Sequence, residues 1–181
     1  MKIPENKTLQ ELFEWRFSRT PDSVAHKFLD RETTYKELNN YSNQVANGLI
    51  ELGCKPDTRI AYYGKNSDFF FEVLIGTLKS NTVTVGVNWR LAPPEVSYVL
   101  NDSESEVLFV GADFYPVIDQ ILEDLPKIKK VVAIDGDHEN YQDYISWRNS
   151  QNSANPEIKS SPNDDICLLY TSPSPRDSDS S

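Results

Sequence analysis

The sequence predicts an α/β fold in which a parallel β-sheet is flanked by helices. Short runs rich in β-branched and aromatic residues alternate with amphipathic segments at a spacing typical of parallel crossover units. The same strand-helix order then repeats along the chain. With 181 residues, of which 38% are hydrophobic, the chain is long enough for one ordinary domain or for a piece of a larger one.

The first 35 residues predict a helix followed by a small hairpin. Apolar residues at helical spacing follow Thr8, a residue type that caps helices, and Pro21 ends the run, which predicts a helix over residues 8–19. The segment SVAHKFLD alternates with period two, and Asp30 and Arg31 can turn it back toward TTY.

The next segments predict a long helix that is followed along the chain by a strand-helix-strand unit. One apolar helical face runs over residues 36–52, and Gly53 stands where a C-terminal cap belongs. A strand at residues 59–64, a helix opened by Asn66 or Ser67 that runs to residue 80, and a β-branched strand at residues 82–88 follow.

A second set of elements repeats this order. Residues 93–103 predict a helix with proline in its first turn, and the expected elements after it are a strand at 106–111, a helix at 113–125 and a strand at 129–135. A short helix around residues 141–147 precedes a polar stretch that has the composition of a surface loop.

Charge and hydropathy narrow the range of partners. The formal net charge of −10 argues against nucleic acid or an anionic membrane as a partner, but it leaves room for a small anion held by backbone N–H groups. The opening residues lack the apolar segment of a signal peptide, and the most hydrophobic stretch, FFFEVLIG, is too short to span a bilayer. We therefore expect a cytoplasmic protein without a transmembrane segment.

Isolated reactive side chains favour structural roles. His26 and His138 lack the partner spacing of a metal site or a catalytic pair, and Cys54 is expected to be an ordinary thiol although Lys55 lies beside it. Arg90 precedes a predicted helix, and we interpret it as fixing a connection rather than binding phosphate.

Several ordered segments resemble the adenylate-forming enzymes, the AMP-dependent synthetase and ligase superfamily. They are TTYKEL with the helix after it, LIGTLKSNTVTVGVN, and NWRLAPPEVSYVLNDSESEVLFVG, and the resemblance covers roughly residues 8–166. The last segment is similar to the acyl-CoA synthetase branch. The resemblance implies that the chain is the N-terminal part of the large domain of such an enzyme.

The resemblance also implies an activity. A carboxylic acid attacks the α-phosphate of Mg²⁺-bound ATP to give an acyl-adenylate and pyrophosphate, and coenzyme A then displaces AMP to give a thioester. In this family the acyl pocket, the nucleotide contacts and the catalytic lysine lie in the missing C-terminal part of the chain. We therefore assign no catalytic residue and no metal ligand here, and we expect this chain alone to be inactive.

One family motif begins in this chain and then breaks. The family's loop, Tyr-Thr-Ser-Gly-Thr-Thr-Gly-x-Pro-Lys, holds the β- and γ-phosphates of ATP, and Thr171 and Ser172 fall on its start. Pro173 and Pro175 then replace residues that must supply N–H donors and positive φ angles. Thr171 and Ser172 are thus the predicted ATP-binding residues, at the start of a loop that cannot form in the family's manner.

The end of the chain has a second interpretation. The string CLLYTSPSPRD matches one reading frame of a common transposon-derived sequencing adapter. We therefore divide the chain into residues 1–166, an incomplete N-terminal portion of an AMP-binding domain, and residues 167–181, a translated adapter tail of low complexity. The letters LLYTS suit both gene and adapter, so a junction can lie within them.

Three functions remain open at this point. The first is a fragment of an ATP-dependent acyl-CoA synthetase, with a fatty acid as the favoured substrate. The second is an aryl-acid or other carboxylate-CoA ligase of the same superfamily, because the residues of the acyl pocket are absent. The third is a non-catalytic α/β binding module that uses the same scaffold.

Overall fold

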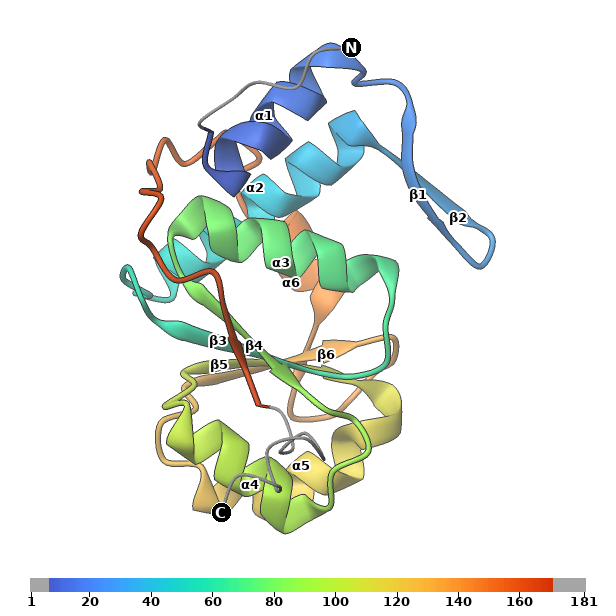
Figure 1. Ribbon diagram of the computed structural model, residues 1–181. Helices are drawn as coiled ribbons and strands as arrows, with labels where there is room; N and C mark the ends of the chain where they lie inside the picture. The colour runs from blue at the N-terminus through green and yellow to red at the C-terminus, as the bar shows by residue number, and fades with distance from the viewer. Residues whose placement is uncertain (1–6, 171–181) are drawn as a thin grey trace, which may run out of the picture.

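A parallel β-sheet with helices on both faces forms the body of the chain in the computed structural model (Figure 1), which describes residues 7–170. The sheet has the strand order β7-β6-β5-β3-β4-β8, and every pair within it is parallel. The strands are β3 (Arg59–Tyr63), β4 (Val83–Val87), β5 (Val107–Gly111), β6 (Lys130–Ile134), β7 (Gln142–Asp143) and β8 (Cys167–Leu169). The predicted α/β class with a parallel sheet is confirmed.

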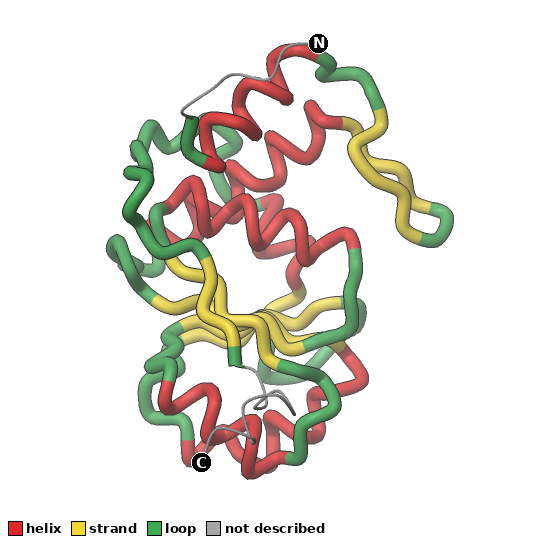
Figure 2. The backbone as a smooth tube through the Cα atoms, in the orientation of Figure 1, coloured by secondary structure: helices red, strands yellow, loops and turns green. Residues whose placement is uncertain are grey.

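Helices cover the two faces of the sheet in separate groups (Figures 1 and 2). On one face lie α2 (Tyr35–Glu51), α3 (Asp68–Ser80) and α6 (Tyr144–Asn149), with α1 (Leu9–Arg19) packed outside them. On the other face lie α4 (Pro93–Asp102) and α5 (Tyr115–Ile121). The predicted hairpin is present as β1 (Val24–Phe28) and β2 (Arg31–Thr34), a separate antiparallel pair.

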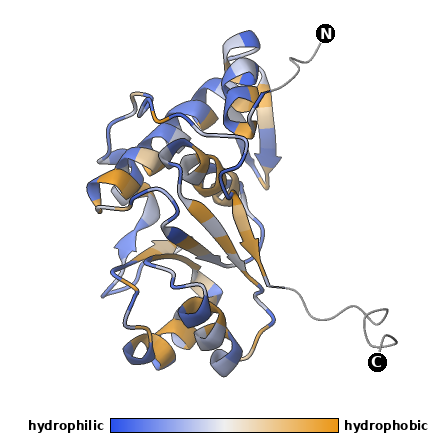
Figure 3. Cartoon of the chain, turned by 60° about the vertical axis from the view of Figure 1, so that its left-hand side comes forward, coloured by the Kyte–Doolittle hydropathy of each residue, from blue (hydrophilic) through white to orange (hydrophobic). Residues whose placement is uncertain are grey.

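The strands alternate their side chains between two hydrophobic cores. Ile60 and Tyr62 of β3 pack with α2, α3 and α6, whereas Ala61 and Tyr63 pack with α4 and α5. Successive side chains of a strand point to opposite faces, so a sheet buried on both sides needs apolar residues at nearly every position. Figure 3 shows hydrophobic residues in strands of the sheet and in parts of the helices that flank it.

Two predicted helices begin or end differently from the expectation. The helix expected at residues 113–125 is divided into a 3₁₀ turn (Ala112–Phe114), α5 and a second 3₁₀ turn (Leu122–Asp124). The first division has a local cause, because Pro116 has no N–H for an α-helical bond to residue 112. The helix expected from residue 141 begins at Tyr144. Asp143 pairs with β6, and its carboxylate caps α6 by accepting from the N–H of Ser146 at 2.7 Å.

A buried ion pair connects α3 to α6. Arg148 Nη1 lies 2.6 Å from Glu72 Oε2, and the Tyr144 hydroxyl donates to the same oxygen at 2.7 Å. The Glu72 side chain is only 2% exposed, and the Arg148 guanidinium lies 3.8 Å from the centre of the Tyr41 ring. Since each charge is withdrawn from water, each depends on the other for its stabilisation.

Arg148→Met is expected to destabilise the chain by about 3–5 kcal/mol, because it leaves the Glu72 carboxylate buried without its cation. Urea denaturation followed by circular dichroism measures this loss. In the double variant Arg148→Met/Glu72→Leu, part of the loss should return, since no buried charge is then unpaired. A double variant that is less stable than Arg148→Met alone would contradict the ion-pair account.

A buried lysine lies between α1, α2 and α3. The Lys79 side chain is 1% exposed, and its Nζ donates to Asn39 Oδ1 at 2.6 Å and to Asn43 Oδ1. The ammonium also lies 5.2 Å from the centre of the Phe17 ring on α1. Neither asparagine oxygen carries a full charge, so burial is not offset by an ion pair, and it lowers the pKa of Lys79 to about 8.

Stability is expected to rise with pH between about 8 and 10.5, relative to the Lys79→Met variant. In that interval the unfolded chain, with the ordinary lysine pKa of 10.5, binds a proton that folded Lys79 has released. The rise should total about 1–3 kcal/mol and should vanish below pH 8, where Lys79 is protonated in both states. Denaturation of both proteins at pH 7, 9 and 10 measures the difference, and parallel curves would refute the low pKa.

Candidate functional site

The carboxyl ends of the parallel strands meet at one edge of the sheet, and this edge is the candidate site. β3 leads to β4 on one side, and the chain then crosses to β5 on the other side of β3. In open α/β sheets, ligands bind outside the carboxyl ends of the strands, where the direction of winding reverses. Here that point lies between the loops that follow β3 and β5.

A cavity of about 290 Å³ opens at this point. Its lining residues include Lys65 and Ser67 after β3 and Asp113 after β5. Lys65 Nζ lies 2.7 Å from Asp113 Oδ2, so an exposed ion pair joins the two loops. The Tyr62 hydroxyl is within 3.0 Å of Ser67 Oγ. These contacts hold the two loops together and place a lysine, a carboxylate and two hydroxyls around one cavity.

The loop after β4 adds an aromatic ring to the same edge. The Arg90 guanidinium lies 4.1 Å from the centre of the Trp89 ring, and Lys65 Nζ lies 5.9 Å from it. The Asn88 side chain accepts from the backbone N–H of Arg90 at 3.0 Å and holds the turn. Arg90 therefore contacts Trp89 within its own connection, as the sequence-based interpretation of a structural role expects.

The predicted ATP-binding residues follow β8 directly. β8 extends the sheet beside β4, with Val85 opposite Leu168 and Gly86 opposite Leu169. Thr171 and Ser172 lie outside the described residues, and their role stays a prediction. Because β8 runs parallel to β4, it leads toward the edge of the sheet at which β4 ends. The described part of the chain ends at Tyr170, the residue before Thr171.

The Tyr170 hydroxyl ties the end of β8 to the end of α4. It donates to Asp102 Oδ2 at 2.6 Å. Partial burial, together with the Asp102 carboxylate, raises the pKa of Tyr170 to about 12. The contact holds the last described residue of the chain against the α4 face of the sheet, where Tyr170 also packs against the hydrophobic core.

Asp102→Asn is expected to lower the pKa of Tyr170 from about 12 toward the ordinary value of 10.0, because it removes the negative charge that opposes ionisation of the phenol. Titration monitored by tyrosinate absorbance, with Tyr170→Phe as the reference that lacks this phenol, isolates the change. An unchanged Tyr170 titration would show that the contact is not maintained in solution.

The isolated side chains occupy structural positions. His26 stacks on Phe71 with ring centroids 5.8 Å apart, and His138 stacks on Tyr141 at 3.9 Å. Burial raises the pKa of the Cys54 thiol to about 11, so Lys55 does not make it a reactive thiolate. Among residues 7–170 no three His, Cys, Asp or Glu side chains are placed to hold a metal ion.

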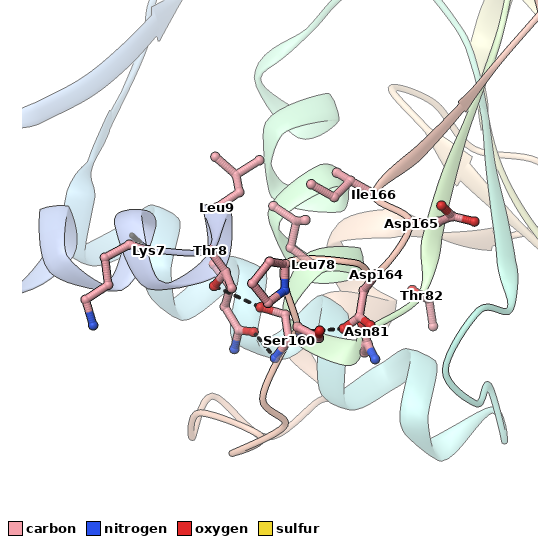
Figure 4. Close-up of a pocket in the computed structure, with 13 residues that line it drawn as sticks. Lys7, Thr8, Leu9, Leu78, Asn81, Thr82, Ser160, Asp164, Asp165 and Ile166 are labelled. Atoms are coloured by element: carbon pink, nitrogen blue, oxygen red, sulfur yellow. Dashed lines mark hydrogen bonds between the residues drawn. The ribbon is translucent and has the colours of Figure 1, made fainter. Parts of the chain in front are cut away.

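A separate pocket of about 190 Å³ lies at the opposite, amino end of β4 and β8 (Figure 4). Its walls come from the start of α1, the end of α3 and the residues that lead into β8, including Thr8, Asn81 and Ser160. Ser160 Oγ donates to Thr8 Oγ1 at 3.0 Å. The residues around this pocket therefore attach the segment that leads into β8 to the start of α1, and they lie away from the carboxyl edge of the sheet.

Comparison with known proteins identifies the family. The family model described as AMP-binding enzyme matches residues 13–174. The chain belongs to the AMP-binding enzyme family. The match extends beyond Ile166, and β8 also uses residues 167–169, three of the positions that the sequence analysis assigned to an adapter tail. Because LLYTS suits both interpretations, the boundary at Ile166 stays a prediction.

Individual members of the AMP-binding family include ligases for several acids. The chain is 34% identical over 170 residues to a fatty acid–[acyl-carrier-protein] ligase of Streptomyces coeruleorubidus, covering 93% of this chain and 31% of that protein. It resembles the crystal structure of an anthranilate CoA ligase in complex with anthranoyl-AMP, with a TM-score of 0.88 and 29% identity, covering 96% of this chain and 34% of that one.

A third AMP-binding relative is a fatty acyl CoA synthetase of Mycobacterium tuberculosis. The structural match has a TM-score of 0.81 and 28% identity, and it covers 90% of this chain and 32% of that one. The chain thus spans about a third of the length of the relatives it matches. Within residues 7–170, none of the helices has the length and apolar character needed to cross a bilayer.

Motif reasoning predicted Thr171 and Ser172, which lie outside the described residues, but it did not predict Lys65, Trp89 or Asp113 at the candidate site. Lys65, Trp89 and Asp113 each lie two positions after the last residue of β3, β4 or β5, and a position just after a strand is the signal that could have found them. What the sequence did not show is the strand order, which brings the loops after β3 and β5 next to each other.

Proposed function

We propose that this chain is the N-terminal third of an ATP-dependent ligase that activates a carboxylic acid as an acyl-adenylate and transfers it to coenzyme A. The proposal rests first on membership of the AMP-binding family, whose model matches residues 13–174. The direction of β8, which leads to the predicted phosphate-binding residues Thr171 and Ser172, agrees with it.

A fatty acid is the favoured substrate class. The 34% identity to a fatty acid–[acyl-carrier-protein] ligase and the likeness to a fatty acyl CoA synthetase support it. The second candidate is an aryl acid, which the TM-score of 0.88 to an anthranilate CoA ligase favours. These matches lie in the part of the protein that precedes the acyl pocket, so the choice between the two acids is a proposal about the whole enzyme.

The residues of this chain do not by themselves suit the triphosphate of ATP. After Thr171 and Ser172, the two prolines at 173 and 175 remove N–H donors that a phosphate-binding loop needs. Mg²⁺ has no cluster of ligands within residues 7–170. We therefore derive no step through ATP, Mg²⁺ or coenzyme A here, and we propose that they bind the complete enzyme.

The 181-residue chain is expected to give no acid-dependent release of pyrophosphate from ATP, because it lacks the donors that neutralise the transferred charge. Resequencing the gene beyond the codon for Ile166 should restore a glycine-rich loop, and the product of the restored gene should form thioesters. Comparison of a fatty acid with anthranilate as substrate, measured by pyrophosphate release, decides the acid class.

Two results would overturn these proposals. Thioester formation by the purified 181-residue chain would refute its inactivity. Recovery of the same prolines and of a stop codon after Ser181 from an independent library, with stable expression of the short product, would replace the enzyme by a non-catalytic α/β module.

A further inference from the structure

An irregular strap, residues 150–166, joins α6 to β8 and contains no helix or strand. In Figure 1 it runs as the orange to red segment beside α1, α2 and α3 before it enters the sheet. An irregular segment has no ladder of its own to satisfy its carbonyl groups, so these groups need partners elsewhere. Side-chain amides of α1 and α2 donate hydrogen bonds to carbonyl groups of the strap.

Three amides of α2 hold the first half of the strap. Asn43 Nδ2 donates to the carbonyl of Ser153 at 2.8 Å, and Gln44 Nε2 donates to that of Gln151 at 3.2 Å. Asn47 Nδ2 donates to two strap carbonyls, those of residues 152 and 154, at 2.7 and 2.8 Å. Since residues 43, 44 and 47 lie on one side of a helix, α2 presents a row of donors to the strap.

α1 holds the second half of the strap. Gln10 Nε2 donates to the carbonyl of Ile158 at 2.8 Å, and Gln10 Oε1 accepts from the N–H of Ser160 at 3.1 Å. Six residues later the carbonyl of Ile166 accepts from the N–H of Thr84 at 3.0 Å, which begins the pairing of β8 with β4. Hydrogen bonds therefore hold the strap along its length, from the end of α6 to the first backbone hydrogen bond between β8 and β4.

The orientation of the Asn43 amide depends on Lys79. An ammonium can only donate, so the oxygen of Asn43 must face Lys79 and its NH₂ group must face the strap. α2 and α3 approach closely enough for this contact because Gly76 has no side chain; a Cβ there would lie 2.5 Å from Val45 Cγ1. Asn39 also accepts from Lys79, but it makes no hydrogen bond to the strap.

We propose that Lys79 and Asn43 are positioning residues: the buried ammonium of Lys79 orients the Asn43 amide so that it holds the strap, and the strap holds β8 beside β4. Because β8 leads to Thr171 and Ser172, the same contacts set the starting position of the phosphate loop. This last consequence rests on the proposed function, whereas the link from Lys79 to β8 does not.

The matched pair Asn43→Asp and Asn39→Asp tests the proposal in the 181-residue chain. Both substitutions place a carboxylate against Lys79 and keep its acceptor. Both remove a side-chain NH₂ group, but only at Asn43 does that group donate to the strap, so only Asn43→Asp turns an acceptor toward the carbonyl of Ser153. Hydrogen-deuterium exchange, read separately for α2, for residues 151–158 and for residues 164–169, measures the response.

Asn43→Asp is expected to raise exchange about tenfold in residues 151–158 and to raise it in residues 164–169, with α2 unchanged, since a lost hydrogen bond of about 1.4 kcal/mol corresponds to a factor of ten. Asn39→Asp should leave both segments as in the parent chain. Equal exchange in the two variants, or faster exchange in the strap without a response in residues 164–169, would overturn the proposal.

Asn47→Ala provides a second variant should Asn43→Asp fail to fold, because Asn47 is only half-buried and its printed hydrogen bonds go to the strap rather than to Lys79. It should raise exchange in residues 151–158 and 164–169, and no change there would overturn the link from strap to β8. Neither measurement uses ligase activity. A restored gene product without ligase activity would refute the proposed function and leave this inference standing.

Discussion

β3 pairs in parallel with β4 on one side and with β5 on the other, and the positions of all other elements follow from this arrangement. Parallel neighbours need crossover helices, so helices cover both faces and the strands must be apolar on both. The same pairing collects all carboxyl ends at one edge. Loops far apart in the sequence, those of Lys65 and Asp113, therefore meet there.

β8 is a short edge strand that its own residues secure only weakly. It has three residues, within residues 7–170 it pairs with β4 alone, and Leu169 is 70% exposed. Its support comes from the strap and from the amides of α1 and α2 that hold it. Among these amides, Asn43 also accepts from Lys79, so its orientation links the buried ammonium to the strap.

Apart from β7 and β8, the elements of the fold were predictable from the sequence to within a few residues, because each has a local cause. Thr8 and Thr34 form capping boxes, and Gly53 adopts a φ of +82° after α2. The errors at Pro116 and Asp143 also have local causes, a missing N–H and a side-chain cap on the N-terminus of α6. For the site, motif reasoning predicted only Thr171 and Ser172, and that prediction lies outside the described residues.

The sequence by itself determined the α/β class, the order of the elements and the family resemblance, since periodicity, caps and ordered motifs are encoded over short stretches of chain. Only the tertiary structure decided which loops border the cavity, that Lys79 is buried without a carboxylate partner, and that a polar stretch without periodicity is a hydrogen-bonded strap. These features depend on contacts between residues up to 152 positions apart, which no local pattern records.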